Sequence, residues 1–312
     1  MRARPPASAP ARNRRARRLR PLVLGLGALL AVVVALAATG VWLARDDDAP
    51  VLRERCRATV AGESTSMSPE QAGNAATVVG ISVLRGLPAR AATIGIATVV
   101  QESGLRNLDH GDRDSLGLFQ QRPSQDWGTP EQVQDPVYAT NAFYDELVRV
   151  DGYRDVEVTV AAQRVQRSAF PEAYGDHEAE ARLVASALTG WTPAGFTCRL
   201  REPEALGALG DDATPSLRAQ RVRDAVAQQV SAVEPQLVAG ENGLVLEYAL
   251  GEGEEAARQA WALGGWAVAS ADGYGVTEVV VASSAWVRAD GGAWADASEP
   301  LPTGTVRVRV SA

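Results

Sequence analysis

The feature that most constrains the fold is residues 91–101, a stretch without charged side chains that ends on the carboxylate of Glu102, just before Gly104. Its apolar content and the glycine that follows predict a helix buried by other helices. In the last turn of such a helix, a carboxylate loses water and faces the partial negative charge of the helix end, and both effects favour its protonated form. Glu102 is therefore the first candidate for chemistry. A surface glutamate at a fraying helix end is the other interpretation of this position.

Basic and acidic side chains are unevenly distributed along the chain. Of the 31 basic residues, all of which are arginine, eight lie within residues 1–20, which contain no acidic residue. The rest of the chain carries a net charge near −15, which argues against nucleic acid as a partner. Residues 1–20 are predicted to be an Arg-rich cytoplasmic arm.

Residues 22–44 contain no charged side chain and are long enough for a membrane-spanning helix, which needs about 20 residues. The arginines before this segment and the three aspartates after it orient the amino terminus toward the cytoplasm. We therefore predict a transmembrane helix over residues 21–44, a juxtamembrane linker over 45–55, and a single-pass protein of the cell membrane whose bulk is extracytoplasmic. Removal of the segment as a signal peptide stays open as an alternative.

Two cysteines, Cys56 and Cys198, bracket the segment that contains Glu102. In an oxidising compartment an isolated pair is typical of a disulfide. Only His110 and His177 could join the cysteines in a metal site, so we predict no metal and no cofactor.

Helical patterns dominate residues 56–200, for which we predict an all-α domain. Two segments combine a capping box with proline at the first helical position: Ser68-Pro69-Glu70-Gln71 and Thr129-Pro130-Glu131-Gln132. Further helices are predicted from Pro88 to Gly104, from Pro136, over residues 160–167, and from Pro171 to Gly190.

Residues 201–214 are rich in Pro, Gly, Ala and Asp and predict a linker. Residues 215–312 mix helical patterns with strands expected over 244–248, 276–281 and 305–310. The predicted fold class is α+β overall: an N-terminal transmembrane helix, an all-α domain over residues 56–200, and a small α+β carboxyl-terminal domain of unknown role over residues 215–312. An envelope protein is a candidate partner of that last domain.

The segment Gln101-Glu102-Ser103-Gly104-Leu105, followed by Gly117-Leu118-Phe119-Gln120, resembles a signature of the lysozyme-like superfamily. It is similar to the soluble lytic transglycosylase and goose-type lysozyme-like domains, and the resemblance covers about residues 57–200. Residues 161–168 fall where these domains carry a third, sugar-contacting motif. Phe119 stands in place of the usual Met, and Val165-Gln166-Arg167-Ser168 in place of the usual Tyr-Asn-Ala-Gly.

The resemblance implies cleavage of peptidoglycan glycan strands at the β-1,4 bond between N-acetylmuramic acid and N-acetylglucosamine. By position, Glu102 would be the general acid and then the base, Ser103 would orient it or the substrate, and Gln120 would hydrogen-bond the sugar at the cleavage point. The other substrate-binding candidates are Gln166, Ser168 and Trp127.

A second carboxylate distinguishes the two reactions that the resemblance allows. A hydrolase needs one as nucleophile or to activate water, whereas in a lytic transglycosylase the muramic acid 6-hydroxyl attacks its own anomeric carbon and leaves a 1,6-anhydro product. Asp109, Asp112 and Asp114 lie between the two motifs and are candidates for that carboxylate. The resemblance favours the single-glutamate route. A lysozyme-type hydrolase and a non-catalytic peptidoglycan-binding or envelope scaffold protein stay open.

Overall fold

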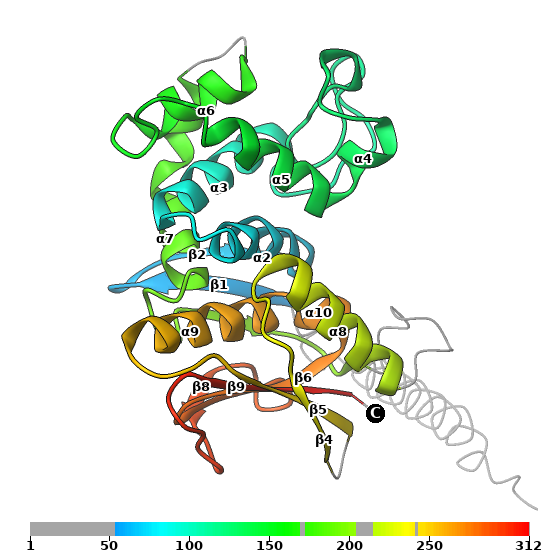
Figure 1. The fold of residues 1–312 in the computed structure, drawn as a ribbon, viewed down its shortest axis with the longest axis vertical. Helices are drawn as coiled ribbons and strands as arrows, with labels where there is room; N and C mark the ends of the chain where they lie inside the picture. The colour runs from blue at the N-terminus through cyan, green and yellow to red at the C-terminus, as the bar shows by residue number, and fades with distance from the viewer. Residues whose placement is uncertain (1–53, 169–171, 204–214, 241–242, 312) are drawn as a thin grey trace, which may run out of the picture. The chain divides into compact units, whose positions relative to one another are not determined.

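The computed structural model describes residues 54–168, 172–203, 215–240 and 243–311 (Figure 1). The predicted cytoplasmic arm and transmembrane helix lie outside these ranges, as do most residues of the two predicted linkers. Nine α-helices and two antiparallel sheets make up the described part of the chain.

Within the described ranges, no helix is long and apolar enough to cross a membrane. The longest of these helices, α2 (Pro69–Leu84) and α9 (Glu254–Ala269), have 16 residues each, fewer than the roughly 20 that a membrane span needs. This finding contradicts the single-pass membrane location and the transmembrane helix in the predicted fold class. Residues 21–44, on which that prediction depended, are not among those described.

Helix α3 (Ala89–Ser103) is enclosed by other helices, as the charge-free segment 91–101 predicts. Every residue from Ala91 to Val99 is buried. At Gly95 a Cβ atom would lie 2.8 Å from the Tyr144 hydroxyl, so only glycine permits this close contact. The helices that contact α3 are α2, α5 (Pro136–Leu147), α6 (Val158–Gln166) and α7 (Glu178–Leu188). Helix α4 (Pro130–Gln134) and the 3-10 turns η1 (Pro123–Gln125) and η2 (Ala173–His177) complete this part of the chain.

The start of α2 holds the end of α3. Ser68 and Gln71 form the predicted capping box, in which the Ser68 amide donates to Gln71 Oε1 over 2.9 Å. The Gln71 amide group also donates to the Gly104 carbonyl over 2.8 Å, and Asn74 donates to the Leu105 carbonyl over 2.8 Å. Gly104 ends α3 in the left-handed conformation, with φ of 61°. The last turn of α3 is therefore fixed by side chains as well as by packing.

The prediction of an all-α domain over residues 56–200 is wrong, because a three-stranded antiparallel sheet of order β2-β1-β3 lies within it. Strand β1 (Arg55–Val60) buries Cys56 and Ala58 and exposes Arg55, Arg57 and Thr59, the alternation of a half-buried strand. Ala61 and Gly62 have φ of 50° and 89°, as a two-residue hairpin turn requires. The other two strands are β2 (Glu63–Met67) and β3 (Phe196–Arg199).

Cys56 and Cys198 form the predicted disulfide, which confirms that pairing. The two residues are direct partners across β1 and β3, and their Cα atoms are 4.0 Å apart although 142 positions separate them in the sequence. Both are fully buried. The bridge therefore closes a loop that contains every helix from α2 to α7.

The carboxyl-terminal sheet has six antiparallel strands in the order β4-β5-β9-β6-β7-β8. In β9 (Thr305–Val310) the valines are buried, while Arg307 and Arg309 pair with Glu247 and Glu278 of neighbouring strands over 3.1 and 2.8 Å. The predicted alternation of this strand is confirmed. The other strands are β4 (Gln236–Gly240), β5 (Gly243–Ala249), β6 (Val276–Val281), β7 (Ser284–Val287) and β8 (Trp294–Asp296), and helices α8 (Pro215–Gln229) and α10 (Ala271–Tyr274) accompany α9.

Helix α9 packs between the helical region, residues 56–200, and the six-stranded carboxyl-terminal sheet. It packs against α2 on one side and against β6 and β9 on the other (Figure 1). The buried side-chain oxygen of Gln229, at the end of α8, accepts hydrogen bonds from the Thr77 hydroxyl of α2 and the Trp266 indole of α9, each over 3.0 Å. The predicted domain boundary at residues 201–214 stays a prediction, but the described residues on its two sides belong to one unit.

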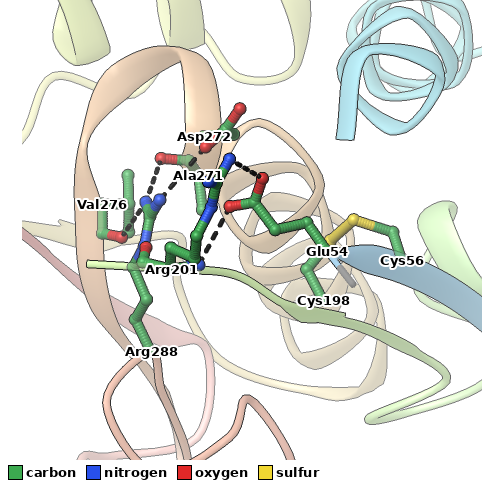
Figure 2. A network of polar contacts seen from close by, with 8 residues as sticks. All are labelled: Glu54, Cys56, Cys198, Arg201, Ala271, Asp272, Val276 and Arg288. Carbon is green, nitrogen blue, oxygen red and sulfur yellow. Dashed lines mark hydrogen bonds and ion pairs between the residues drawn. A yellow bond between two sulfur atoms is a disulfide. The ribbon is translucent and has the colours of Figure 1, made fainter. Parts of the chain in front are cut away.

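Near the disulfide, the buried side chain of Arg288 links the carboxyl-terminal part of the chain to the segment that follows β3 (Figure 2). Arg288 is 1% exposed, and a buried guanidinium without partners would cost several kcal/mol. Its acceptors are the carbonyl oxygens of Ala271, Val276 and Arg201 and the carboxylate of Asp272. Because Arg201 also pairs with Glu54 over 2.8 Å, the segments on both sides of the disulfide are held to the carboxyl-terminal part.

We expect the double variant Cys56→Ala/Cys198→Ala to fold but to be less stable. Closing a loop of this length contributes about 4–5 kcal/mol in the chain-entropy description of disulfides. For a protein of this size that corresponds to a loss of roughly 10–15 °C in Tm, which thermal unfolding followed by circular dichroism measures. Alanine is preferred to serine because both sulfur atoms are buried.

A reductant supplies the matched control. It should lower the Tm of the wild-type protein toward that of the double variant and leave the double variant unchanged. An oxidised wild type no more stable than the double variant would contradict the stabilising role of the bridge.

Candidate functional site

Two adjoining hollows lie beside the end of α3, and we refer to them together as the cleft. The first has a volume of about 530 Å³ and the second about 500 Å³. Gln125, Trp127, Gln166 and Arg167 line both of them. The first hollow is also lined by Glu102, Asp112, Arg113, Ser115, Gln120, Gln121, Arg122 and Ser168, and the second by Asp126, Glu146 and Val165.

Glu102 is half-buried in the last turn of α3 and lines the first hollow. Loss of water raises the pKa of its carboxyl group above the usual value of 4.5, and hydrogen bonds from Tyr174 and Gln166 oppose that rise without cancelling it. The position thus combines burial, which favours the protonated form, with donors that stabilise the carboxylate.

Tyr174 is the contact that sequence reasoning missed. Its side chain is fully buried in η2, and its hydroxyl donates to Glu102 Oε1 over 2.5 Å. Burial and the neighbouring carboxylate raise the pKa of Tyr174 well above its usual range, so the hydroxyl stays protonated and acts as a donor. No local pattern marks this residue, since 72 positions separate it from Glu102.

Ser103 connects the two sequence motifs through the backbone. Its hydroxyl lies 3.0 Å from the Val99 carbonyl and 2.7 Å from the Leu118 carbonyl. It does not line the cleft. The structure therefore gives Ser103 a supporting position, in which it fastens the segment 117–120 to the end of α3.

Gln120 lines the same hollow as Glu102, and its backbone has a positive φ of 47°. Its side-chain nitrogen donates to the carbonyls of Gly117 and His110 over 3.2 and 3.3 Å. A Cβ atom on Gly117 would lie 2.1 Å from the Val133 carbonyl, so the chain can turn here only with glycine. The segment 117–120 thus brings Gln120 to the cleft by a backbone turn that its glycine permits.

The third motif also reaches the cleft. Gln166, at the end of α6, donates to the Phe119 carbonyl over 2.7 Å. Gln163 donates to the carbonyl of Ser168 over 2.8 Å, and Ser168 lines the first hollow. Trp127 is half-buried and lines both hollows, where an indole offers a flat apolar face to a sugar ring.

The three candidate second carboxylates have different positions. Asp114 accepts hydrogen bonds from Arg122 and from the Ser124 amide, each over 2.8 Å, and these donors hold its pKa well below the usual range. Asp109 is exposed, pairs with His110 and does not line the cleft. Asp112 is the one of the three that lines the same hollow as Glu102.

Among the residues that the structure describes, no cluster of three or more His, Cys, Asp or Glu side chains could hold a metal ion. No protein-family model matches the chain, and no curated protein matches it either. The resemblance to lysozyme-like domains therefore stays a prediction from the sequence motifs.

We expect Glu102→Gln to raise the stability of the protein at neutral pH. A carboxyl group whose pKa is raised by folding contributes stability below its unfolded pKa, and that contribution is lost as the pH rises through the folded pKa. Glutamine keeps the shape and does not ionise, so the variant avoids this loss. Its Tm should exceed that of the wild type at pH 7 by about 2–4 °C for each kcal/mol recovered.

The two Tm values should converge as the pH falls below 4.5, the ordinary pKa of a glutamate side chain. The exposed residue Glu63 provides the control variant Glu63→Gln, which removes a carboxyl group that lines neither hollow. A constant or inverted difference for Glu102→Gln would contradict the raised pKa.

Proposed function

We propose that this protein cleaves peptidoglycan glycan strands at the β-1,4 bond between N-acetylmuramic acid and N-acetylglucosamine, with Glu102 as the catalytic acid and then base. The observation that carries the proposal is a carboxyl group of raised pKa at a cleft it shares with Gln120, Gln166 and Trp127. A protonated carboxyl near neutral pH is what the departure of a glycosidic oxygen requires.

The reaction that fits these residues best is that of a lytic transglycosylase. Glu102 donates its proton to the glycosidic oxygen as the bond to the anomeric carbon breaks. The muramic acid 6-hydroxyl then bonds to that carbon, and its proton passes to the Glu102 carboxylate. The products are a 1,6-anhydromuramic acid end and a strand with a free N-acetylglucosamine 4-hydroxyl, without consumption of water.

The hydrogen bonds around Glu102 suit both halves of this cycle. When Glu102 is ionised, the Tyr174 hydroxyl stabilises the charge that the lost proton leaves behind. When the proton returns, burial favours the neutral acid. We therefore assign Tyr174 and Gln166 as positioning residues for the acid, and Gln120, Ser168 and Trp127 as residues that contact the sugar.

We expect Glu102→Gln to abolish clearing of purified peptidoglycan in a zymogram. Loss of a general acid and base typically costs about 10²–10⁴-fold in rate, below what such a gel detects. The matched control is Glu63→Gln, an exposed glutamate that lines neither hollow and should clear as the wild type does. Equal clearing by Glu102→Gln, or none by the wild type, would contradict the proposal.

The products distinguish a lytic transglycosylase from a hydrolase. We expect mass spectrometry of the digest to find 1,6-anhydromuropeptides, which are lighter by one water than the reducing products of a hydrolase. Because the proposed route needs one carboxylate, Asp112→Asn should retain the larger part of the activity, within about fivefold, and the same products. Reducing ends in the digest together with an inactive Asp112→Asn would show a hydrolase with Asp112 as second carboxylate.

A further inference from the structure

Arg167 lies where the two hollows of the cleft meet, since it lines both of them. It is the residue that ends α6, and its backbone is left-handed with φ of 54°. A left-handed backbone is uncommon for a residue other than glycine, asparagine or aspartate. The amide of Arg167 donates to the Gln163 carbonyl over 2.8 Å, which ties this conformation to the end of the helix.

The guanidinium of Arg167 has no ionic or hydrogen-bonding partner among the described residues. Two other charged residues that line the cleft, Arg122 and Glu146, do have ionic partners. Arg122 is held by Asp114 over 2.8 Å, and Glu146 of the second hollow is already paired with Arg149. Arg122 and Glu146 thus have partners within the protein, whereas the exposed guanidinium of Arg167 is open to a ligand that enters the cleft.

The charges that line the first hollow are mostly positive. Three arginines line it, Arg113, Arg122 and Arg167, against the carboxyl groups of Glu102 and Asp112. This contrasts with the chain after residue 20, whose net charge is near −15. The second hollow adds the carboxylates of Asp126 and Glu146, so the formal charges of the cleft as a whole nearly cancel, and an anion is attracted locally, at Arg167.

We propose that Arg167 binds a carboxylate of the substrate, and that the cleft thereby prefers glycan strands with an anionic group on muramic acid over neutral polysaccharides. This inference rests on the proposed peptidoglycan cleavage and names the feature of the strand that the site recognises. A guanidinium presents two parallel N–H donors to a carboxylate, a geometry that a neutral acetamido or hydroxyl group does not match. Arg167 lines the same hollow as Glu102, so this contact would form in the hollow that holds the bond that Glu102 would protonate.

Two carboxylates of peptidoglycan have this chemistry. One is the lactyl carboxylate of a muramic acid that has lost its peptide, and the other is a carboxylate of the stem peptide. The binding experiment therefore uses three soluble ligands: strands stripped of peptide, strands that retain the stem peptide, and stripped strands whose carboxylates have been converted to amides. Chitin oligosaccharides serve as the neutral reference.

Binding is measured with full-length protein carrying Glu102→Gln, so that no ligand is cleaved during the titration. Arg167→Gln in this background should weaken binding of a carboxylate-bearing strand about tenfold at low salt, the scale expected for losing a charge-assisted hydrogen bond. It should leave binding of the amidated strands and of chitin oligosaccharides unchanged. The affinity of Arg167→Lys for a carboxylate-bearing strand should lie between those of the protein with Arg167 and of Arg167→Gln, because lysine keeps the charge and loses the paired donors.

Arg164→Gln is the matched control. Arg164 lies on the same helix, donates to the Asp151 carbonyl and lines neither hollow, so its loss should not change any of the dissociation constants. A larger effect of Arg167→Gln on stripped strands than on peptide-bearing strands identifies the lactyl carboxylate as the ligand, and the reverse identifies the stem peptide.

Equal losses for amidated and carboxylate-bearing strands, or no loss at all, would overturn the role of Arg167 and leave the proposed cleavage intact. Failure of the protein to bind any of the peptidoglycan strands, with Arg167 present, would overturn both proposals.

Discussion

Helix α3 carries no charge from Ala91 to Val100, so it is stable in water only where other elements cover it. Helices α2, α5, α6 and α7 cover it, and the disulfide closes the chain around this set. Because α3 is fixed along its length and Gln71 holds its carboxyl end, its last turn has one position relative to the segment 117–120 and to α6. The geometry of the cleft follows from that position.

The pKa of Glu102 is set by opposing effects, of which burial is the larger. Burial favours the neutral acid, while Tyr174 and Gln166 favour the carboxylate. A fully buried and unpartnered carboxyl would seldom ionise, and an exposed one would seldom hold a proton at neutral pH. A half-buried carboxyl group with hydrogen-bond donors lies between these extremes, so a single group can donate a proton and later accept one.

Local signals predicted the helices well. The capping boxes at Ser68 and Thr129 are both present, the glycine at the end of α3 has the expected left-handed backbone, and the alternating valines and arginines of β9 form the expected strand. The sheet of β1, β2 and β3 was missed. Its hairpin strands have only five and six residues, and β3 is a four-residue strand whose partner lies at the other end of the helical region.

The sequence by itself determined that Glu102 ends a buried helix and that Cys56 could pair with Cys198, because each of these depends on neighbouring residues or on residue type. Only the tertiary structure decided that Tyr174 donates to the acid, and that Asp114 is engaged by donors of the loop. Those contacts depend on the distance between segments that are far apart in the sequence, and packing of the helices around α3 sets that distance.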